Sequence, residues 1–291
     1  KRLFLLDAFA LIFRGYYAFI KNPRINSKGI NTSAILGFTN SLLDVIKRER
    51  PDYLAVCFDK GGSKSRTDLF TEYKANRDET PEAISLAIPY IQKILDAMHI
   101  PIVVKEGYEA DDIIGHLVES TQQFGQCEDV LIVSRDGDFK QLQRYTNVRQ
   151  YSPIDKKFLV EKNPSDFLSE HILRGDKGDG IPNVLSPNNT FVDGLRQTPL
   201  TKDKLQMLLS DPKSLGDEVY KNYIRNKTLI DLRETPEEIV TKILNTYSSD
   251  CELQSLALGF EGYQRASRVM NYLMKNNCRN LMEVAGDFTN G

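Results

Sequence analysis

The sequence has no tryptophan, three histidines and four cysteines among its 291 residues. The cysteines are far apart and form no CxxC pair, which excludes a disulfide framework and a structural zinc site. Long apolar runs are also missing: the one near the N-terminus is interrupted at Asp7 and falls short of the ~20 apolar residues of a membrane span. These absences predict a protein of a reducing cytoplasm, with no membrane segment.

A strong net charge is lacking too, because 38 Lys and Arg stand against 40 Asp and Glu, for a net charge of -2. This balance excludes a uniformly basic, histone-like protein. It does not exclude a nucleic-acid partner, because opposite charges can gather on different faces of a protein. The basic residues are unevenly placed: seven, against four acids, lie within 135–162, and four, with no acid, lie within 264–280.

Three apolar, β-rich runs each end on an aspartate: LFLLD at 3–7, YLAVCFD at 53–59 and VLIVSRD at 130–136. Nearly continuous apolar runs are typical of strands that are covered on both faces. Helical patterns lie between them at 33–50, 80–99 and 109–124, with Thr80 as the expected N-cap of the second and Pro81 at its first position. This alternation predicts an α/β fold with a central, mostly parallel sheet flanked by helices.

The pattern changes after about residue 151. A helix is predicted over 164–174, closed by Gly175, and a long irregular connection rich in Gly, Pro and Asn follows over 175–199. Helical patterns resume at 201–209, 236–247 and 263–276. We therefore expect two domains, a core over residues 1–183 and a smaller helical domain over 184–291.

Acidic residues gather where these predicted elements begin or end. An aspartate after a single strand is usually a turn or cap residue, but here all three strands end on one, and ligands of open α/β sheets bind beyond the carboxyl ends of the strands. The first turn of the 109–124 helix and two Gly-rich turns add further acids. The candidate cluster has nine carboxylates: Asp7, Asp59, Glu109, Asp111, Asp112, Asp136, Asp138, Asp176 and Asp179.

So many like charges repel one another unless cations neutralise them. An all-oxygen ligand set favours hard divalent ions, Mg²⁺ or Mn²⁺ rather than zinc. Two such ions about 4 Å apart suit in-line displacement at phosphorus, because one activates a water and the other stabilises the leaving oxygen. The cluster therefore predicts a metal-dependent phosphodiester hydrolase.

A basic segment over 60–78 would suit a nucleic-acid substrate. Phe70 and Tyr73 are interleaved with its cations, a mixture that can neutralise phosphates and stack on a base. A solvated, charged helix explains the same window equally well. The basic residues of the segment are Lys60, Lys64, Arg66, Lys74 and Arg77.

Five strings occur in one order: LLDAFALIFRGYYAF, FDKGGSKSRTDLFTEYKANRDETPE, GYEADDIIG, SRDGDF and GDKGDGIP. Over roughly residues 2–183 they resemble the flap endonuclease or 5′-nuclease superfamily. The first half is similar to the 5′-nuclease domain of bacterial DNA polymerase I, and the later half is more similar to the ribonuclease H of T-even phages. The resemblance implies a PIN-like core, a helical arch over about 60–85 and a helical C-terminal domain that binds DNA.

The resemblance also implies an activity. Such enzymes use two Mg²⁺ ions, for which Mn²⁺ can substitute, and hydrolyse phosphodiesters near a 5′ end as exonucleases and flap endonucleases. They remove RNA primers and 5′ flaps from DNA and RNA/DNA hybrids during replication. For this chain the resemblance implies a monomer in the cytoplasm of a bacterial cell or a phage-infected host.

Roles for single residues follow from the same resemblance. Lys74 would stabilise charge on the scissile phosphate. On the arch helix, Tyr73 would stack on a displaced base and Arg77 would bind a phosphate, and Arg66 is a further nucleic-acid-binding candidate. Glu109 would sit between the metals, and Asp112 and Asp176 would act directly or through water. The acids expected to take part in catalysis are Asp7, Asp59, Asp111, Asp136 and Asp138. The first metal would be bound by Asp7, Asp59 and Asp111, and the second by Asp136, Asp138 and Asp179.

The sequence departs from the bacterial pattern after Pro182, where cellular enzymes usually carry a glycine-rich helix-hairpin-helix that holds duplex DNA. Duplex binding is instead assigned to Arg196, Lys202 and Lys204. The C-terminal region resembles that of the phage form, which suggests contacts with a single-strand-binding protein or a sliding clamp.

Two alternatives remain open from the sequence. One is a PIN-type ribonuclease, which has a related sheet and acidic cluster but is usually shorter and lacks the arch strings. The other is a non-catalytic DNA-binding module of the replication fork, which would gain nothing from nine carboxylates facing phosphate. Metal-dependent cleavage of 5′-flap substrates separates the three possibilities.

Overall fold

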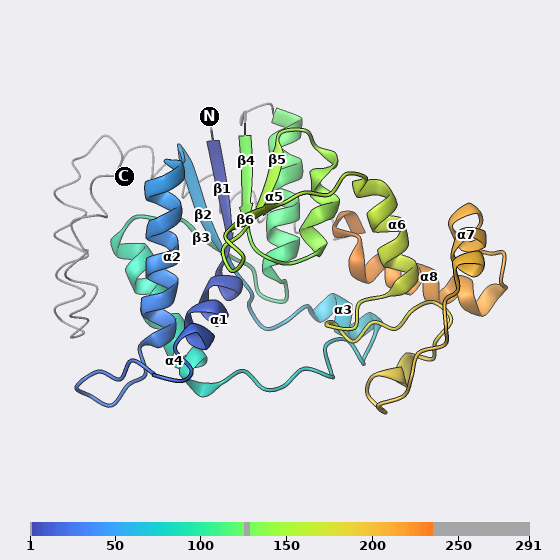
Figure 1. Ribbon diagram of the computed structural model, residues 1–291, viewed down its shortest axis with the longest axis horizontal. Helices are drawn as coiled ribbons and strands as arrows, with labels where there is room; N and C mark the ends of the chain where they lie inside the picture. The colour runs from blue at the N-terminus through green and yellow to red at the C-terminus, as the bar shows by residue number, and fades with distance from the viewer. Residues whose placement is uncertain (1, 125–128, 235–291) are drawn as a thin grey trace.

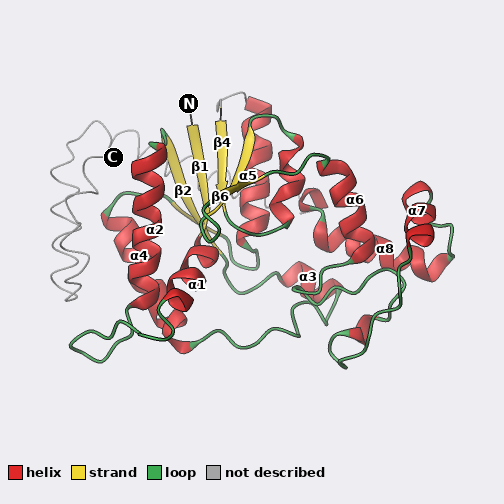
Figure 2. Ribbon diagram, in the orientation of Figure 1, coloured by secondary structure: helices red, strands yellow, loops and turns green. Residues whose placement is uncertain are grey.

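The computed structural model describes residues 2–124 and 129–234, which form a six-stranded sheet with helices packed around it (Figures 1 and 2). The strand order is β3-β2-β1-β4-β5-β6, and every neighbouring pair is parallel except β5 and β6. The mostly parallel α/β fold predicted from the sequence is thus confirmed. The strands are β1 (Arg2–Asp7), β2 (Tyr53–Phe58), β3 (Ile102–Val104), β4 (Asp129–Val133), β5 (Val148–Ser152) and β6 (Lys157–Leu159).

Both faces of the sheet are buried, because successive side chains of a strand point to opposite faces. Phe4 and Leu6 pack into a cluster formed with α1 (Ala8–Ala18), α2 (Ser33–Glu49) and α4 (Glu82–Ala97). Leu3 and Leu5 pack into a second cluster with α5 (Ala110–Phe124) and the short 3₁₀ helix η1 (Asp138–Arg144). A strand covered in this way needs apolar residues at every position, which explains the unbroken apolar runs.

Helices α1 and α2 cross at two glycines, which lets their backbones come into direct contact. A Cβ atom placed on Gly37 would lie 2.2 Å from the Cα atom of Gly15. The crossing holds α1, which begins directly after Asp7, against the sheet.

A smaller group of helices follows the sheet: α6 (Pro164–Arg174), α7 (Lys202–Ser210) and α8 (Asp217–Ile230). In Figure 1, α7 and α8 lie on the opposite side of the molecule from α2. Leu205 and Leu208 of α7 pack with Leu173 and Val184, whereas Leu229 of α8 belongs to a cluster that also contains Phe70. The division between residues 183 and 184 stays a prediction. No helix in the two described ranges combines the length and apolar character of a membrane span.

Several expected helices match the observed ones within two residues at each end, namely those predicted over 33–50, 109–124, 164–174 and 201–209. The predicted N-cap Thr80 and the predicted first helical position of Pro81 are both wrong, because α4 begins at Glu82 and Pro81 is its N-cap. Of the arch expected over about 60–85, α3 (Lys64–Leu69) and the start of α4 are helical, and turns lie between them over 71–77. The helices expected at 236–247 and 263–276 lie outside the described residues, as does the basic stretch over 264–280.

The α1–α2 crossing gives the first prediction. Replacing Gly37 with Ala puts a Cβ atom into the backbone of α1, so the helices must move apart. Overpacking of this kind destabilises by about 1–3 kcal/mol, and we expect Gly37→Ala to lower the melting temperature by several degrees in a thermal unfolding measurement. Gly137→Ala is the matched control, because a Cβ atom there has no neighbour within 4 Å. Equal melting temperatures for the two variants would contradict the close crossing.

Candidate active site

The site lies beyond the carboxyl ends of β1, β2 and β4, where Asp7, Asp59 and Asp136 end or follow their strands. Strand β1 has β2 on one side and β4 on the other, so the chain reverses its strand order at β1, and such a position forms a crevice in open α/β sheets. Asp7 also caps α1, because its Oδ1 accepts a hydrogen bond from the Ala10 backbone N–H at 3.1 Å. The Ser134 hydroxyl donates to the other oxygen of Asp7 at 2.9 Å and so links the ends of β1 and β4.

Asp59 brings the start of α5 to the same edge. Its Oδ1 accepts a hydrogen bond from the Ala110 backbone N–H at 2.6 Å. Because Ala110 is the first residue of α5, this bond fixes the three acids Glu109, Asp111 and Asp112 beside the strand ends. Their carboxylate oxygens lie within 4.8 Å of one another, close enough to hold one metal ion.

Arg66 neutralises this group of acids from within the protein. Its guanidinium donates to Glu109 at 2.7 Å and to Asp112 at 2.7 Å, and lies 3.5 Å from Asp111. Only 7% of Arg66 is exposed. Buried ion pairs of this kind are sensitive to the loss of one partner, because the remaining charge stays uncompensated.

The turns over 71–77 cover the acids from the other side. Tyr73 donates its hydroxyl to Glu109 at 2.7 Å and to Asp179 at 3.0 Å, and the Lys74 ammonium lies 2.6 Å from Glu109. Lys74 has a left-handed backbone, with φ of 56°, and its N–H donates to the Asp179 carbonyl at 2.8 Å. Gly180 completes the contact, because a Cβ atom there would lie 2.8 Å from the Asn76 side chain.

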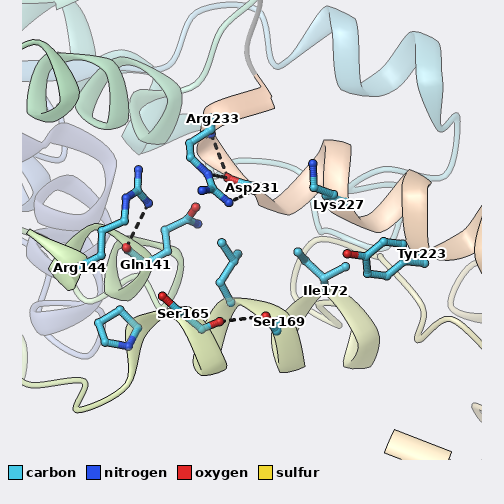
Figure 3. Close-up of a pocket in the computed structure, with 11 residues that line it drawn as sticks. Gln141, Arg144, Ser165, Ser169, Ile172, Tyr223, Lys227, Asp231 and Arg233 are labelled. Atoms are coloured by element: carbon cyan, nitrogen blue, oxygen red, sulfur yellow. Dashed lines mark hydrogen bonds and ion pairs between the residues drawn. The ribbon is translucent and has the colours of Figure 1, made fainter. Parts of the chain in front are cut away.

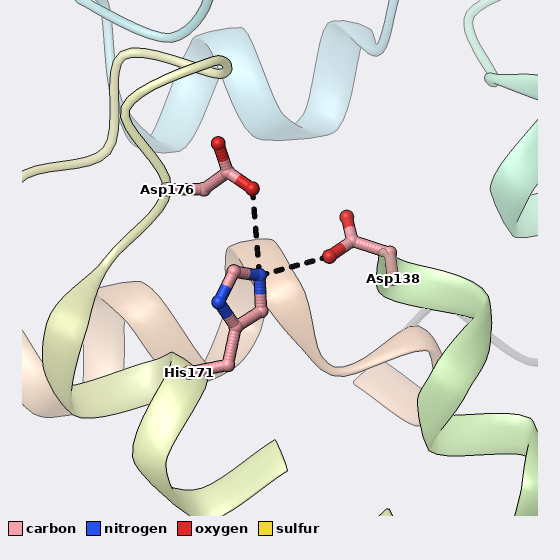
Figure 4. A group of neighbouring side chains, drawn as sticks. All are labelled: Asp138, His171 and Asp176. Carbon is pink, nitrogen blue, oxygen red and sulfur yellow. Dashed lines mark hydrogen bonds and ion pairs between the residues drawn. The ribbon is translucent and has the colours of Figure 1, made fainter. Parts of the chain in front are cut away.

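A second group joins η1 to the loop after α6 (Figure 4). Nε2 of His171 lies 2.9 Å from Oδ1 of Asp138 and 3.4 Å from Oδ2 of Asp176. Asp136 is next to this group, because its Oδ1 accepts a hydrogen bond from the Asp138 N–H at 2.9 Å. The three facing atoms of Asp138, His171 and Asp176 also lie within 4.8 Å of one another.

Burial raises the pKa of several of these acids. The pKa of Asp59 rises to about 7, first because of burial and then because of the nearby charge of Asp7. Burial also raises the pKa of Asp112 to about 7, although Arg66 acts in the opposite direction. The pKa values of Asp7, Asp136 and Asp138 are likewise raised, in each case mainly by burial. These raised pKa values reflect the free-energy cost of keeping so many buried carboxylates ionised together.

Two acids behave differently because cations face them. Burial raises the pKa of Asp111, but the charges of Arg66 and Lys74 outweigh burial and leave it below its usual value. The hydrogen bond from His171 lowers the pKa of Asp176. In return, Asp138 and Asp176 outweigh the burial of His171 and raise its pKa to about 10, so that its imidazole is protonated at neutral pH.

The structure brings all nine predicted carboxylates to one edge of the sheet, but two predicted nucleic-acid contacts lie elsewhere than expected. Tyr73 is 6% exposed and packs with Phe70, and Arg66 is enclosed by the acids, so neither faces solvent as a base or phosphate contact would. Tyr73 and Arg77 also lie in turns rather than on an arch helix. The side chain of Arg77 is 50% exposed and pairs with Asp179.

The three duplex-binding candidates lie apart from the acids. Arg196 is exposed on the connection before α7, and Lys202 and Lys204 are exposed on its first turn. Figure 1 shows α7 beyond α6, on the side of the molecule opposite α2.

Sequence reasoning did not identify two residues that contact the acids, Ser134 and His171. Ser134 lies at the end of an apolar strand, where its position beside Asp136 was the only available signal. His171 lies five residues before Asp176 on a helix of ordinary composition. Its contact with Asp138 joins segments 33 residues apart, which no local pattern reports.

A separate pocket of about 240 Å³ opens between η1, α6 and α8 (Figure 3). None of the nine carboxylates lines it. Its cations are each paired with a carboxylate, Arg144 with Glu119, Arg233 with Asp231 and Lys227 with Glu234. This compensation leaves the pocket without the excess of one charge that marks the acidic site.

The acidic site fits divalent metal ions. Nine carboxylates face three permanent cations, Arg66, Lys74 and Arg77, together with His171, so negative charge is in excess. Carboxylate oxygens are the ligands that hard divalent ions prefer.

The raised pKa of Asp59 gives the second prediction. Asp59 has a pKa of 3.8 in the unfolded protein and about 7 in the folded protein. At pH values between these two, the folded protein binds a proton that the unfolded protein has released, so the free energy of unfolding falls as the pH rises through this window. In EDTA we expect the free energy of unfolding to fall from pH 4.5 to pH 7.5, and Asp59→Asn to reduce that fall by roughly 2–4 kcal/mol. Urea unfolding at several pH values measures this effect.

Asp68→Asn is the control for this measurement, because Asp68 is an exposed carboxylate close by in sequence. It should leave the pH dependence unchanged. A wild-type protein that gains stability across the same window would contradict the assignment.

Comparisons with known proteins agree with this arrangement. A family model described as "5'-3' exonuclease, N-terminal resolvase-like domain" matches residues 2–170, and one described as "T4 RNase H, C terminal" matches residues 165–288. The DNA polymerase I of Caldicellulosiruptor bescii is 32% identical over 79% of this chain and 26% of its own length. The 5'-3' exonuclease of Aquifex aeolicus is 37% identical over 63% of this chain and 65% of its own length. The chain therefore spans less than two thirds of these relatives.

Solved structures share the fold. A bacteriophage T5 protein co-crystallized with metal ions is 19% identical, with a TM-score of 0.62 over 86% of this chain and 99% of the other. A bacteriophage T5 flap endonuclease in a complex with DNA and metal ions is also 19% identical, with a TM-score of 0.61 over 87% of this chain and 100% of the other. By the match of its first 170 residues and by its acidic sheet edge, this chain belongs to the 5′-3′ exonuclease family.

Proposed function

We propose that this protein is a metal-dependent 5′ to 3′ nuclease and flap endonuclease that removes RNA primers and 5′ flaps during DNA replication. The observation that carries the proposal is the convergence of nine carboxylates at the carboxyl ends of β1, β2 and β4, covered by Lys74 and Arg77. A binding module would gain nothing from such an excess of negative charge beside phosphate.

Two Mg²⁺ ions, or Mn²⁺ in their place, are part of the proposal. The acids of β1, β2 and α5 would hold one ion, among them Asp7, Asp59 and Asp111. The acids around η1 and the loop after α6 would hold the other, among them Asp136, Asp138 and Asp179. When bound, such ions lower the pKa of an attacking water and stabilise charge on the reacting phosphate.

The chain's own cations then have separate tasks. Lys74, whose ammonium lies 2.6 Å from Glu109, is close enough to the acids to neutralise charge on a scissile phosphate held there. Arg77 would bind a neighbouring phosphate, which the exposure of half of its side chain supports. Arg66 is buried, so its task is to keep Glu109 and Asp112 together rather than to contact the substrate.

Substrate and partners complete the proposal. DNA and RNA/DNA hybrids with a 5′ end or flap would cross the acidic edge, and duplex DNA would extend toward Arg196, Lys202 and Lys204 on a helical domain that begins near residue 184. A bacteriophage T5 relative of the same fold is described in a complex with DNA. We further propose that the protein acts as a cytoplasmic monomer, and that residues in the C-terminal region contact a single-strand-binding protein or a sliding clamp.

The proposal predicts the outcome of a cleavage assay. End-labelled 5′-flap and RNA-primed substrates are incubated with the protein in Mg²⁺ or in EDTA. We expect cleavage from the 5′ side in Mg²⁺ and none in EDTA. Asp136→Asn and Lys74→Ala should each lower the single-turnover rate by about 100-fold or more. Asp136→Asn removes an anionic ligand from one of the proposed metal ions, and Lys74→Ala removes a positive charge beside the reacting phosphate.

The controls are matched in chemistry and lie on α4, away from the acids. Asp96→Asn and Lys93→Ala remove an exposed carboxylate and an exposed ammonium and should leave the rate unchanged. Tight binding of the flap without Mg²⁺-dependent cleavage would refute the enzyme and favour a binding module. Cleavage of single-stranded RNA alone would favour a PIN-type ribonuclease.

A further inference from the structure

His171 faces two carboxylates that come from different segments of the chain. It lies on α6, whereas Asp138 begins η1 and Asp176 lies in the loop that follows α6. Figure 4 shows the Nε2 edge of the ring directed between the two carboxylates. The separations are 2.9 Å to Oδ1 of Asp138 and 3.4 Å to Oδ2 of Asp176.

Neighbouring groups hold both the ring and one of the acids in place. The imidazole stacks on Phe167, with ring centroids 5.5 Å apart and planes 23° apart. Oδ1 of Asp176 accepts hydrogen bonds from the N–H groups of Gly178 at 2.7 Å and Asp179 at 3.2 Å. Because these bonds occupy Oδ1, the other oxygen of Asp176 is left to face His171. Such outer contacts orient metal ligands in proteins.

We propose that His171 is a nitrogen ligand of the divalent ion that Asp138 and Asp176 help to hold, and that the ion displaces the Nε2 proton which the ring carries in the metal-free protein. This inference rests on the proposed function, because it concerns the ion that the proposed function assigns to the acids around η1 and the loop after α6. Adjacent ligands of an octahedral ion, each at about 2.1 Å from the metal, lie about 3 Å apart. The two separations measured from Nε2 bracket this value.

The imidazole has a consequence for the choice of metal. Mg²⁺ prefers oxygen ligands alone, whereas first-row transition ions bind imidazole nitrogen readily. A site with two carboxylates and one imidazole therefore favours Mn²⁺ over Mg²⁺, while the all-oxygen group of Glu109, Asp111 and Asp112 does not. The two positions are thus chemically different.

A purely positioning role is the competing explanation, in which His171 only donates a hydrogen bond that holds Asp138 near Asp176. The two roles differ in whether nitrogen is bonded to the ion. Pulsed electron paramagnetic resonance on the full chain loaded with Mn²⁺ detects a directly bonded imidazole through its nitrogen coupling. Labelling the histidines with ¹⁵N identifies the source of the signal, because the chain contains only three.

We expect a nitrogen coupling in the wild-type protein that changes on ¹⁵N-histidine labelling and is absent from His171→Asn. Asparagine keeps a hydrogen-bond donor for the carboxylates but cannot replace the imidazole as a ligand. His99→Asn is the control, because His99 lies after α4 with a left-handed backbone that Asn tolerates. It should retain the coupling.

Metal affinity gives an independent readout by calorimetric titration. His171→Asn should weaken Mn²⁺ binding by at least the about 10-fold that the loss of an outer partner of a ligand costs, and should weaken Mg²⁺ binding much less. Equal weakening of both ions, or bound Mn²⁺ without nitrogen coupling in the wild type, would overturn the ligand role and leave the proposed nuclease intact. A wild-type protein that binds no divalent ion would refute the proposed function and this inference together.

Discussion

The acidic site depends on the burial of like charges at the carboxyl ends of parallel strands. The ends of β1, β2 and β4 meet there because the strands run in one direction, and the bond from Ala110 to Asp59 adds the acids of α5. The cost of this arrangement is visible in the raised pKa values of Asp59 and Asp112, both about 7. A folded protein keeps ionised carboxylates this close together only when cations offset their mutual repulsion.

The cations closest to the acids come from the basic segment over 60–78, which the sequence alone predicts to be a surface that contacts nucleic acid. Arg66, Tyr73 and Lys74 turn back over Glu109, and the same segment is fastened to the loop after α6 through the bond from the Lys74 N–H to Asp179. Metal binding and substrate binding must therefore act on the same contacts, because the groups that neutralise the acids also lie nearest to where phosphate would bind. Exposure of Tyr73 to a base would require this segment to move.

The strands β1, β2 and β4 and the acidic edge could be predicted because they follow from local patterns, whereas β3, β5 and β6 were not identified. Apolar runs that end on Asp7 and Asp136 indicate two-sided strands and place their carboxyl ends together. The burial of Arg66 and the contact of His171 with Asp138 could not be predicted, because they depend on how segments distant in the sequence pack against one another. Helix α8 was missed because its sequence is mostly polar. Besides Leu229 and Ile230 it buries Arg225, whose guanidinium donates to the Pro182 carbonyl and to the Asn226 side-chain oxygen.

The central claim is that the acids at this edge hold divalent cations. Thermal unfolding of the EDTA-treated protein at pH 8, with and without Mn²⁺, tests it most directly. An ion bound only by the folded protein at about 100 times its dissociation constant stabilises by about 2.7 kcal/mol. We predict a clear rise in melting temperature for the wild type and a much smaller one for Asp136→Asn. An unchanged wild-type melting temperature, or an equal rise in the variant, would contradict the claim.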